Sequence, residues 1–274
     1  MVHFRRGRKS PRRERRALVG EAPLTIEIRG GSAYTLMRTP GEDRELAVGF
    51  LFSEGLIAGM AELLTLEECA RDANVVRVAL AASAGLPPRR NLTVSSSCGL
   101  CGRAGLESLV AGLGPVGPGL RVPLEVLYAL PERVRAGQAL FRATGGSHAA
   151  ALFDAAGRVL ALREDLGRHN ALDKVLGWAL LSGTALAPLG VFLSGRASLE
   201  MVAKAARAGL GLVAAVSAPT TAAASAARRV GLTLCGFVRG AEVTIYTRPE
   251  RIAMASGRQV RSGERRSRTE RKPS

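Results

Sequence analysis

Two cysteines separated by two residues are the part of the sequence best suited to covalent chemistry. Cys98 and Cys101 lie in the segment Ser97-Cys-Gly-Leu-Cys-Gly102, on a predicted tight turn that enters a helix over residues 103–110. A thiol at a helix N-terminus is shifted toward the thiolate, which is the form that attacks or carries sulfur. The spacing leaves three interpretations open: a nucleophile or persulfide carrier, a redox pair, and half of a zinc site. A complete zinc site requires a second close pair of ligands, whereas Cys69 and Cys235 are isolated in the sequence.

Four polar segments punctuate the second half of the chain, at residues 144–148, 163–169, 194–198 and 217–221, and the first three contain glycine. Three of them follow predicted strands and two directly precede predicted helices, where free backbone N–H groups and the helix dipole favour phosphate. In an open α/β sheet, ligands gather beyond the carboxyl ends of the strands. The best candidates for an anion cradle are therefore Ser194, Gly195, Arg196 and Ser198. The alternative is ordinary helix capping by Ser198 and a solvated Arg196.

Two histidines belong to these polar segments. His148 and His169 are each expected in a loop, where an imidazole can donate to an anion or move a proton. The alternative is a histidine that is hydrogen-bonded to the backbone of its own loop. Asp165, Asp173 and Lys174 surround His169 in the sequence, and ion pairs around a helix start are the common fate of such groups.

The first half of the chain has patterns of both strands and helices. Alternating apolar residues, broken by a Gly-Gly pair, predict a β-hairpin over residues 24–37. Apolar residues at helical spacing over 46–51 predict a helix, with Glu42 and Asp43 in its first turn, where the dipole favours acids. A further strand is predicted over residues 76–80.

Strands and helices alternate from residue 124 onward. A helix comes first and is followed by a hairpin over residues 149–162, a helix over 170–181, strands over 191–193, 212–216, 232–238 and 243–246, and helices over 199–208 and 221–229. This alternation predicts an α/β domain with a mixed sheet. The segment Gly112-Leu-Gly-Pro-Val-Gly117 matches the dinucleotide fingerprint, but it follows a helix, and its prolines suit a linker between subdomains.

Charge is concentrated at the two ends of the chain. The formal net charge is +16, of which residues 1–16 contribute +7 and residues 256–274 contribute +5, so residues 17–255 are only mildly basic. Blocks of like charge with few apolar residues cannot offset the entropy of ordering, so we expect a basic flexible arm and a basic flexible tail there. They either contact nucleic acid or an acidic partner, or are dispensable extensions. An aromatic content of 4% argues against single-strand binding, so nucleic acid is not an expected partner.

The composition indicates a globular protein without membrane spans. Hydrophobic residues make up 47% of 274 residues, which is enough for one large domain or two small ones. Two uncharged runs, over 175–195 and 208–227, are interrupted by Ser, Thr, Gly and Pro. Arg5-Arg6 is not followed by the apolar stretch that an export signal requires. The cysteine usage fits a reducing compartment, so we expect a cytoplasmic protein.

A series of sequence blocks between residues 22 and 252 resembles, in the same order, the formate dehydrogenase accessory sulfurtransferase family, FdhD/NarQ. The blocks that carry the resemblance are Ala22-Pro-Leu-Thr-Ile26, Ala47-Val-Gly-Phe-Leu-Phe-Ser-Glu-Gly-Leu-Ile57, Ser97-Cys-Gly-Leu-Cys-Gly102, Thr144-Gly-Gly-Ser-His-Ala-Ala-Ala-Leu-Phe-Asp154, Arg163-Glu-Asp-Leu-Gly-Arg-His-Asn-Ala-Leu-Asp-Lys174, Ser194-Gly-Arg-Ala-Ser198, Ser217-Ala-Pro-Thr220 and Gly236-Phe-Val-Arg-Gly240. So many blocks in the same order make chance agreement a poor explanation.

The resemblance implies a homodimer with two parts in each chain. A cytidine-deaminase-like α/β domain with a mixed sheet, residues 119–255, would be preceded by a smaller α+β subdomain, residues 17–118, that carries the Cys-x-x-Cys loop. Deaminase chemistry is not expected, because the zinc-binding motifs of such enzymes do not occur here in the required order. We therefore assign no metal ligands.

The resemblance also implies sulfur transfer in the formation of active formate dehydrogenase. A cysteine desulfurase would donate sulfur to the cysteine loop, with Cys98 as the persulfide site and Cys101 as helper or resolving thiol. The acceptor would be the bis-guanine-dinucleotide molybdenum cofactor, with a guanine nucleotide as its mimic. The alternative is a non-catalytic chaperone that binds the molybdenum cofactor without sulfur chemistry.

One further segment matches the region to which cofactor binding is assigned in this family. It consists of Phe237, Val238, Arg239, Gly240, Ala241 and Glu242, with Arg239 as the anion partner. Together with residues 194–198, this segment is expected to hold the phosphates of the guanine nucleotides. His148 and His169 would orient loops or anions.

Overall fold

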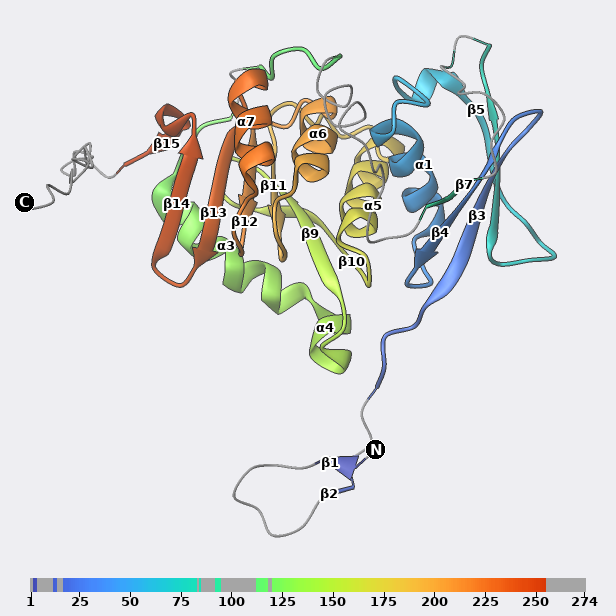
Figure 1. The fold of residues 1–274 in the computed structure, drawn as a ribbon, viewed down its shortest axis with the longest axis horizontal. Coiled ribbons are helices and arrows are strands. Elements are labelled where there is room, and N and C mark those ends of the chain that lie inside the picture. Colours follow the sequence, from blue (N-terminus) through green and yellow to red (C-terminus); the bar gives the residue numbers. More distant parts are fainter. Residues whose placement is uncertain are drawn as a thin grey trace, which may run out of the picture.

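The structure is a computed structural model in which residues 17–82, 84, 112–117 and 120–254 are described, with the backbone of the short strands at 2–3, 12–13 and 92–94 (Figure 1). The strands β1 (Val2–His3) and β2 (Arg12–Arg13) pair with each other in antiparallel fashion. Cys98, Cys101, the helix predicted over 103–110 and the tail over 256–274 lie outside the described residues, as does most of the arm over 1–16. Their predicted features remain predictions.

A six-stranded mixed sheet forms the larger half of the molecule. Its order is β10 (Val159–Asp165), β9 (His148–Phe153), β11 (Gly190–Leu193), β12 (Leu212–Ala215), β13 (Thr233–Arg239) and β14 (Glu242–Thr247). The three strands β11, β12 and β13 are parallel, and the other neighbouring pairs are antiparallel. The predicted α/β class with a mixed sheet is confirmed.

Helices cover both faces of this sheet (Figure 1). Residues of β11 alternate between two hydrophobic clusters, with Val191 and Leu193 in one and Phe192 in the other. The first cluster includes residues of α5 (Arg168–Leu181), α6 (Leu199–Arg207) and α7 (Thr221–Val230). The second includes residues of α3 (Leu124–Gly137) and of the paired strands β8 (Val122–Pro123) and β15 (Ile252–Ala253). The short helix α4 (Ala139–Thr144) follows α3, and η2 (Pro249–Arg251) precedes β15.

A second sheet, of five strands, forms the smaller half. Its order is β5 (Leu63–Glu68), β6 (Val75–Leu80), β3 (Ala22–Ile28), β4 (Ala33–Arg38) and β7 (Leu92–Val94). The predicted hairpin is confirmed as β3 and β4, whose turn contains Gly30 at a φ of 73°. The strand β5, which follows η1 (Met60–Glu62), was not expected from the pattern because Leu64 interrupts its alternation. The register shifts at this residue, and its side chain is 63% exposed.

The helix α1 (Asp43–Ser53) joins the two halves. It lies between the five-stranded sheet and α5 in Figure 1, and it packs backbone to backbone against α5 at two glycines. A Cβ on Gly49 would overlap the carbonyl oxygen of Asp173, and a Cβ on Gly177 would overlap that of Glu45. The helix begins at Asp43 as expected, but Glu42 is the N-cap residue at a φ of 53° rather than part of the first turn.

Residues 112–117 have no helix or strand, and the next described element is the strand β8 rather than the helix that a dinucleotide fingerprint opens, so the segment is a connection. The segment is nevertheless attached to the larger half, because Val116 is buried and its N–H donates to the carbonyl oxygen of Val230 at 2.7 Å. Within the described ranges, no helix has the length and apolar character that crossing a membrane requires.

Candidate functional site

The carboxyl ends of the parallel strands meet at one edge of the six-stranded sheet. The segments that follow β11 and β12 are joined there by a bridge between Ala197 and Pro219, and the N–H of Thr220 donates to the carbonyl oxygen of Ala197 at 3.1 Å. The N–H of Phe237 in β13 donates to the carbonyl oxygen of Ser217 at 3.3 Å. The structure thus brings three of the predicted segments together, as the rule for open α/β sheets requires.

His148 lies at the same edge, because β9 runs antiparallel to β11 and begins where β11 ends. The expected loop position was wrong: His148 is the first residue of β9, and its Cα partner in β10 is Asp165. The Oγ atom of Ser194 accepts from the N–H of Ala149 at 2.8 Å. A Cβ on Gly195 would lie 3.3 Å from Nδ1 of His148, a tight contact, so a side chain at this position would push against the imidazole.

The imidazole of His148 is held neutral by its surroundings. Burial lowers its pKa from the ordinary value of 6.5, and the positive charges of Arg168 and His169 lower it further. Asp165 acts in the opposite direction but does not outweigh them. At pH 7 His148 therefore offers one donor and one acceptor nitrogen to a ligand.

His169 is also part of a regular element rather than of a loop. It is the second residue of α5, and its Nε2 atom lies 2.8 Å from Oε2 of Glu200 in the first turn of α6, an ion-pair distance at which the angles of a hydrogen bond are not met. This contact lowers the pKa of Glu200, against the effect of burial. The predicted loop 163–169 is short because β10 extends to Asp165 and α5 begins at Arg168. The backbone donors of two residues between these elements, Leu166 and Gly167, are satisfied by side chains.

Arg168 is a further candidate at this edge, which the sequence pattern alone did not single out. It is the first residue of α5, where the helix dipole disfavours a cation. Its Nε atom is buried and has no hydrogen-bond partner among the described residues. An arginine at the start of a buried helix, directly before a histidine, was the sequence signal that could have identified it.

Ser198 and Thr220 begin neighbouring helices but use their hydroxyl groups differently. Thr220 caps α7, since its Oγ1 atom accepts from the N–H of Ala223 at 3.2 Å. Ser198 is the N-cap residue of α6, yet its Oγ atom is buried and makes no hydrogen bond within the described part of the chain. The alternative of ordinary side-chain capping by Ser198 is therefore wrong. Arg196, in the same segment, is exposed.

The segment from Phe237 to Glu242 forms the end of β13 and the turn into β14. Phe237 and Gly240 have positive φ values of 51° and 55°, and the guanidinium carbon of Arg239 lies 5.4 Å from the centroid of the Phe237 ring. Arg239 and Glu242 are exposed cross-strand partners, as the register shows, and Ala241 is exposed between them. The side chain of Val238 is buried in the core, so this residue can offer a ligand only its backbone.

Two cysteines lie within the described residues, and one of them is unsuited to carrying sulfur. Cys235 is buried in β13, and burial raises the pKa of its thiol to about 12, which leaves almost no thiolate near neutral pH. Cys69 is half-buried. The strand β7 ends at Val94, four residues before Cys98 in the sequence.

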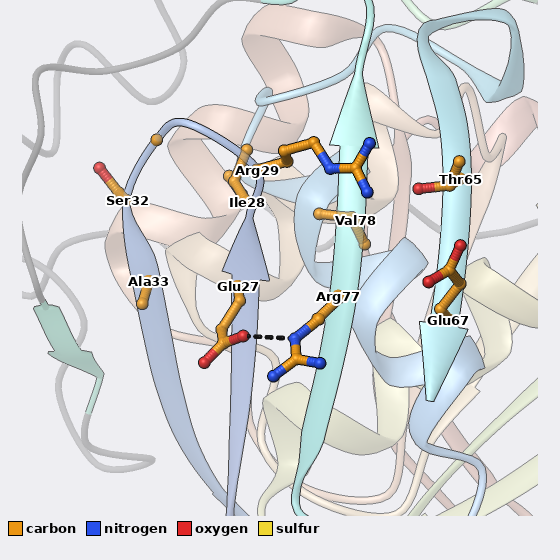
Figure 2. A pocket seen from close by; sticks show the side chains of 10 residues that line it. Glu27, Ile28, Arg29, Ser32, Ala33, Thr65, Glu67, Arg77 and Val78 are labelled. Atoms are coloured by element: carbon orange, nitrogen blue, oxygen red, sulfur yellow. Dashed lines mark hydrogen bonds and ion pairs between the residues drawn. The ribbon is translucent and has the colours of Figure 1, made fainter. Parts of the chain in front are cut away.

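A separate groove of about 440 Å³ lies over β3, β4, β5 and β6 of the five-stranded sheet (Figure 2). Its lining includes Arg29, Thr65 and the ion pair of Arg77 with Glu27, whose Nε and Oε2 atoms are 2.9 Å apart. None of the predicted site residues lines this groove. It is therefore distinct from the edge at which the predicted segments meet.

Comparison with known proteins agrees with the resemblance seen in the sequence. The model of the FdhD/NarQ family matches residues 19–253. The sulfur carrier protein FdhD of Anaeromyxobacter dehalogenans strain 2CP-C is 43% identical over 258 residues, which cover 88% of this chain and 90% of that protein. The protein of the same name from Mycobacterium tuberculosis H37Rv is 43% identical over 253 residues, 86% of this chain and 91% of its own.

A solved structure is also similar over nearly the whole chain. It is the crystal structure of a candidate formate dehydrogenase accessory protein from Desulfotalea psychrophila, with a TM-score of 0.74 and 25% sequence identity. The match covers 92% of this chain and 97% of the other.

Proposed function

Because the chain belongs to the FdhD/NarQ family, we propose that it is a sulfur carrier that serves the maturation of formate dehydrogenase. The donor would be a cysteine desulfurase and the acceptor the bis-guanine-dinucleotide molybdenum cofactor. This function requires two features of the chain: a thiol that carries sulfur, and a surface that binds the anionic acceptor.

The acceptor-binding part is supported above all by two orphaned polar atoms. Nε of Arg168 and Oγ of Ser198 are buried and have no hydrogen-bond partner within the described residues. Leaving a buried donor unpaired costs about 1–3 kcal/mol, so each of these atoms requires a partner, and a bound ligand can supply it. A phosphate group that accepts from Arg168, Ser198 and the free N–H groups of α6 would satisfy them.

The other predicted residues have roles consistent with this placement. His148 would orient the anion as a neutral donor, and His169 would hold α5 against α6 through Glu200. Arg239 and the ring of Phe237 would contact a second part of the guanine nucleotide. Arg196 is exposed and would add charge at the entrance of the site.

The proposed sulfur transfer begins with the Cys98 thiolate. It attacks the terminal sulfur of a persulfide on the desulfurase; the S–S bond of the donor breaks, and the donor cysteine leaves as a thiolate. Cys98 then carries the sulfane sulfur as a persulfide. No oxidant is consumed, because this sulfur moves from one thiol to another and keeps its oxidation state. Cys101 would act as helper or resolving thiol when the sulfur passes to the acceptor.

The position of β7 supports a short path from the carrier to the acceptor. This strand runs parallel to β4, and its last residue, Val94, pairs with Leu36. Thr39, three residues further along, donates its N–H to Oδ2 of Asp165 at 3.0 Å, and Asp165 is the cross-strand partner of His148. The four residues from Val94 to Cys98 span at most about 14 Å.

Guanosine diphosphate is the probe that tests the acceptor site. Arg168→Ala is expected to weaken its binding by about 10- to 100-fold, because a hydrogen bond to a charged group contributes about 1.5–3 kcal/mol. The matched control is Arg228→Ala, which removes an exposed arginine from the last turn of α7 and should leave the affinity unchanged. Titration calorimetry measures both, and equal affinities of Arg168→Ala and wild type would remove this site from the proposal.

Two finer features of the family remain proposals. One is that the domain built on the six-stranded sheet is cytidine-deaminase-like, as the family resemblance implies. Its outer strands β10 and β14 each pair with one neighbour within the described chain, so either could pair with a second copy in a homodimer.

A further inference from the structure

The carboxylate of Asp165 gathers four donors at the end of β10. Its Oδ1 atom accepts from the N–H of Gly167 at 2.8 Å and from Nδ2 of Asn170 at 3.0 Å. Its Oδ2 atom accepts from the N–H of Thr39 at 3.0 Å and lies 3.0 Å from Nζ of Lys174. Asp165 and the Lys174 side chain are both fully buried, so this is a fixed arrangement rather than a solvated ion pair.

The same cluster holds the turn between β4 and α1 against the start of α5. The Oγ1 atom of Thr39 accepts from the N–H of Leu166 at 3.0 Å, which makes the contact with the Asp165 segment reciprocal. Asn170 also donates to the carbonyl oxygen of Met37 at 2.8 Å, and Lys174 donates to that of Thr39 at 3.1 Å. Through these bonds the smaller half is attached to the start of α5, next to Arg168 and His169.

We propose that Asp165 is a positioning residue, which sets His148 and Arg168 in register with the turn that follows β4. The inference rests on the proposed function for the role of the site itself. Asp165 lies opposite His148 in the β9–β10 pair, and three residues later the chain reaches Arg168. The N-cap residue of α5 is Gly167, which has no side chain, so Asp165 supplies the acceptor that fixes this turn.

A second buried carboxylate provides the matched control. Asp173 is 2% exposed, lies within hydrogen-bond distance of Lys204 at 2.7 Å, and accepts from Oγ of Ser53 in α1 at 2.7 Å. It therefore joins the two halves in the same way and with similar burial. It differs from Asp165 in lying inside α5, away from the turn that precedes Arg168.

The test compares Asp165→Asn with Asp173→Asn in the full chain. In Asp165→Asn, the amide nitrogen of the new side chain would place a donor against other donors, namely the N–H of Thr39 and Nζ of Lys174, so the turn is expected to move. We expect guanosine diphosphate binding to weaken on the order of tenfold in Asp165→Asn, as for the loss of other supporting hydrogen bonds. Asp173→Asn should keep the wild-type affinity, even where thermal unfolding shows it to be equally destabilised.

A charge-neutral variant separates positioning from electrostatics and also serves if Asp165→Asn does not fold. Thr39→Val removes the acceptor of the Leu166 N–H without changing any charge and without touching the proposed ligand. Titration of the imidazole signals of His148 and His169 by NMR reports on the site without a ligand. The charge-neutral control is Ser53→Ala, which removes a donor to Asp173. A change of either titration curve in Thr39→Val, absent in Ser53→Ala, supports the positioning role even if guanosine diphosphate is not the ligand. The role is overturned if Thr39→Val leaves the two curves unchanged, or if Ser53→Ala changes them at least as much.

Discussion

Cells whose wild-type gene is replaced by Cys98→Ala are expected to lose formate dehydrogenase activity by more than about 100-fold, the scale on which removal of a nucleophile acts. The reason is chemical, since alanine cannot accept sulfane sulfur from a donor persulfide. The replacement removes only one sulfur atom, so we expect the protein itself to remain folded. Formate-dependent dye reduction in extracts measures the activity, and an immunoblot measures the amount of protein.

Cys235→Ala is the control for this result. The Cys235 side chain is buried in β13, and its pKa of about 12 keeps it as an inert thiol. Its replacement removes one buried sulfur atom and should leave the dehydrogenase activity near that of wild type. Full activity in Cys98→Ala, or loss of activity only in Cys235→Ala, would contradict the assignment of the carrier.

The contact between α1 and α5 predicts the largest effect on stability. Gly177→Ala would place a methyl group where the carbonyl oxygen of Glu45 lies, so the two helices must separate. Overpacking of this kind costs about 1–3 kcal/mol and occasionally more, and backbone atoms cannot rotate away as a side chain can. We expect a loss of roughly 3 kcal/mol in the free energy of unfolding, and a fall of roughly 10 °C in Tm.

The sign of this effect makes the prediction sharp. Helix propensity alone predicts that alanine in place of glycine stabilises a helix interior by about 1 kcal/mol. Gly114→Ala, where nothing lies within 4 Å of the added methyl group, should change the stability little. Urea unfolding of the two variants and wild type measures the free energies. A stability of Gly177→Ala equal to or above that of wild type would show that the helices are not in backbone contact.

Much of the fold followed from the sequence pattern because it depends on local periodicity. The hairpin of β3 and β4, the helix α1 and the alternation from β9 to β14 all have apolar residues at the spacing of their element. The strand β5 did not, since Leu64 lies at a register shift on an outer strand and is exposed. Edge strands bury one side only in part, so their sequences show a weaker alternation of apolar and polar residues.

The sequence predicted which segments form the candidate site better than it predicted how their residues are arranged. The segments after β11 and β12 were expected at one edge, and the topology places them there. The two histidines were expected in loops, whereas the pairing of β9 and β10 and the early start of α5 place both in regular elements. The role of Asp165 depends on Thr39, which lies 126 residues away in the sequence. No local pattern contains such a contact.

Intact mass spectrometry shows directly whether Cys98 carries sulfur. Purified wild type, Cys98→Ala, Cys101→Ala and Cys235→Ala are each incubated with a cysteine desulfurase and cysteine, then weighed before and after reduction. If Cys98 is the carrier, every form except Cys98→Ala gains one sulfur atom, which a reductant removes. A Cys98→Ala chain that gains the sulfur atom would move the carrier role to another cysteine. A wild-type chain that gains none would contradict the carrier role and favour a chaperone that binds the molybdenum cofactor without sulfur chemistry.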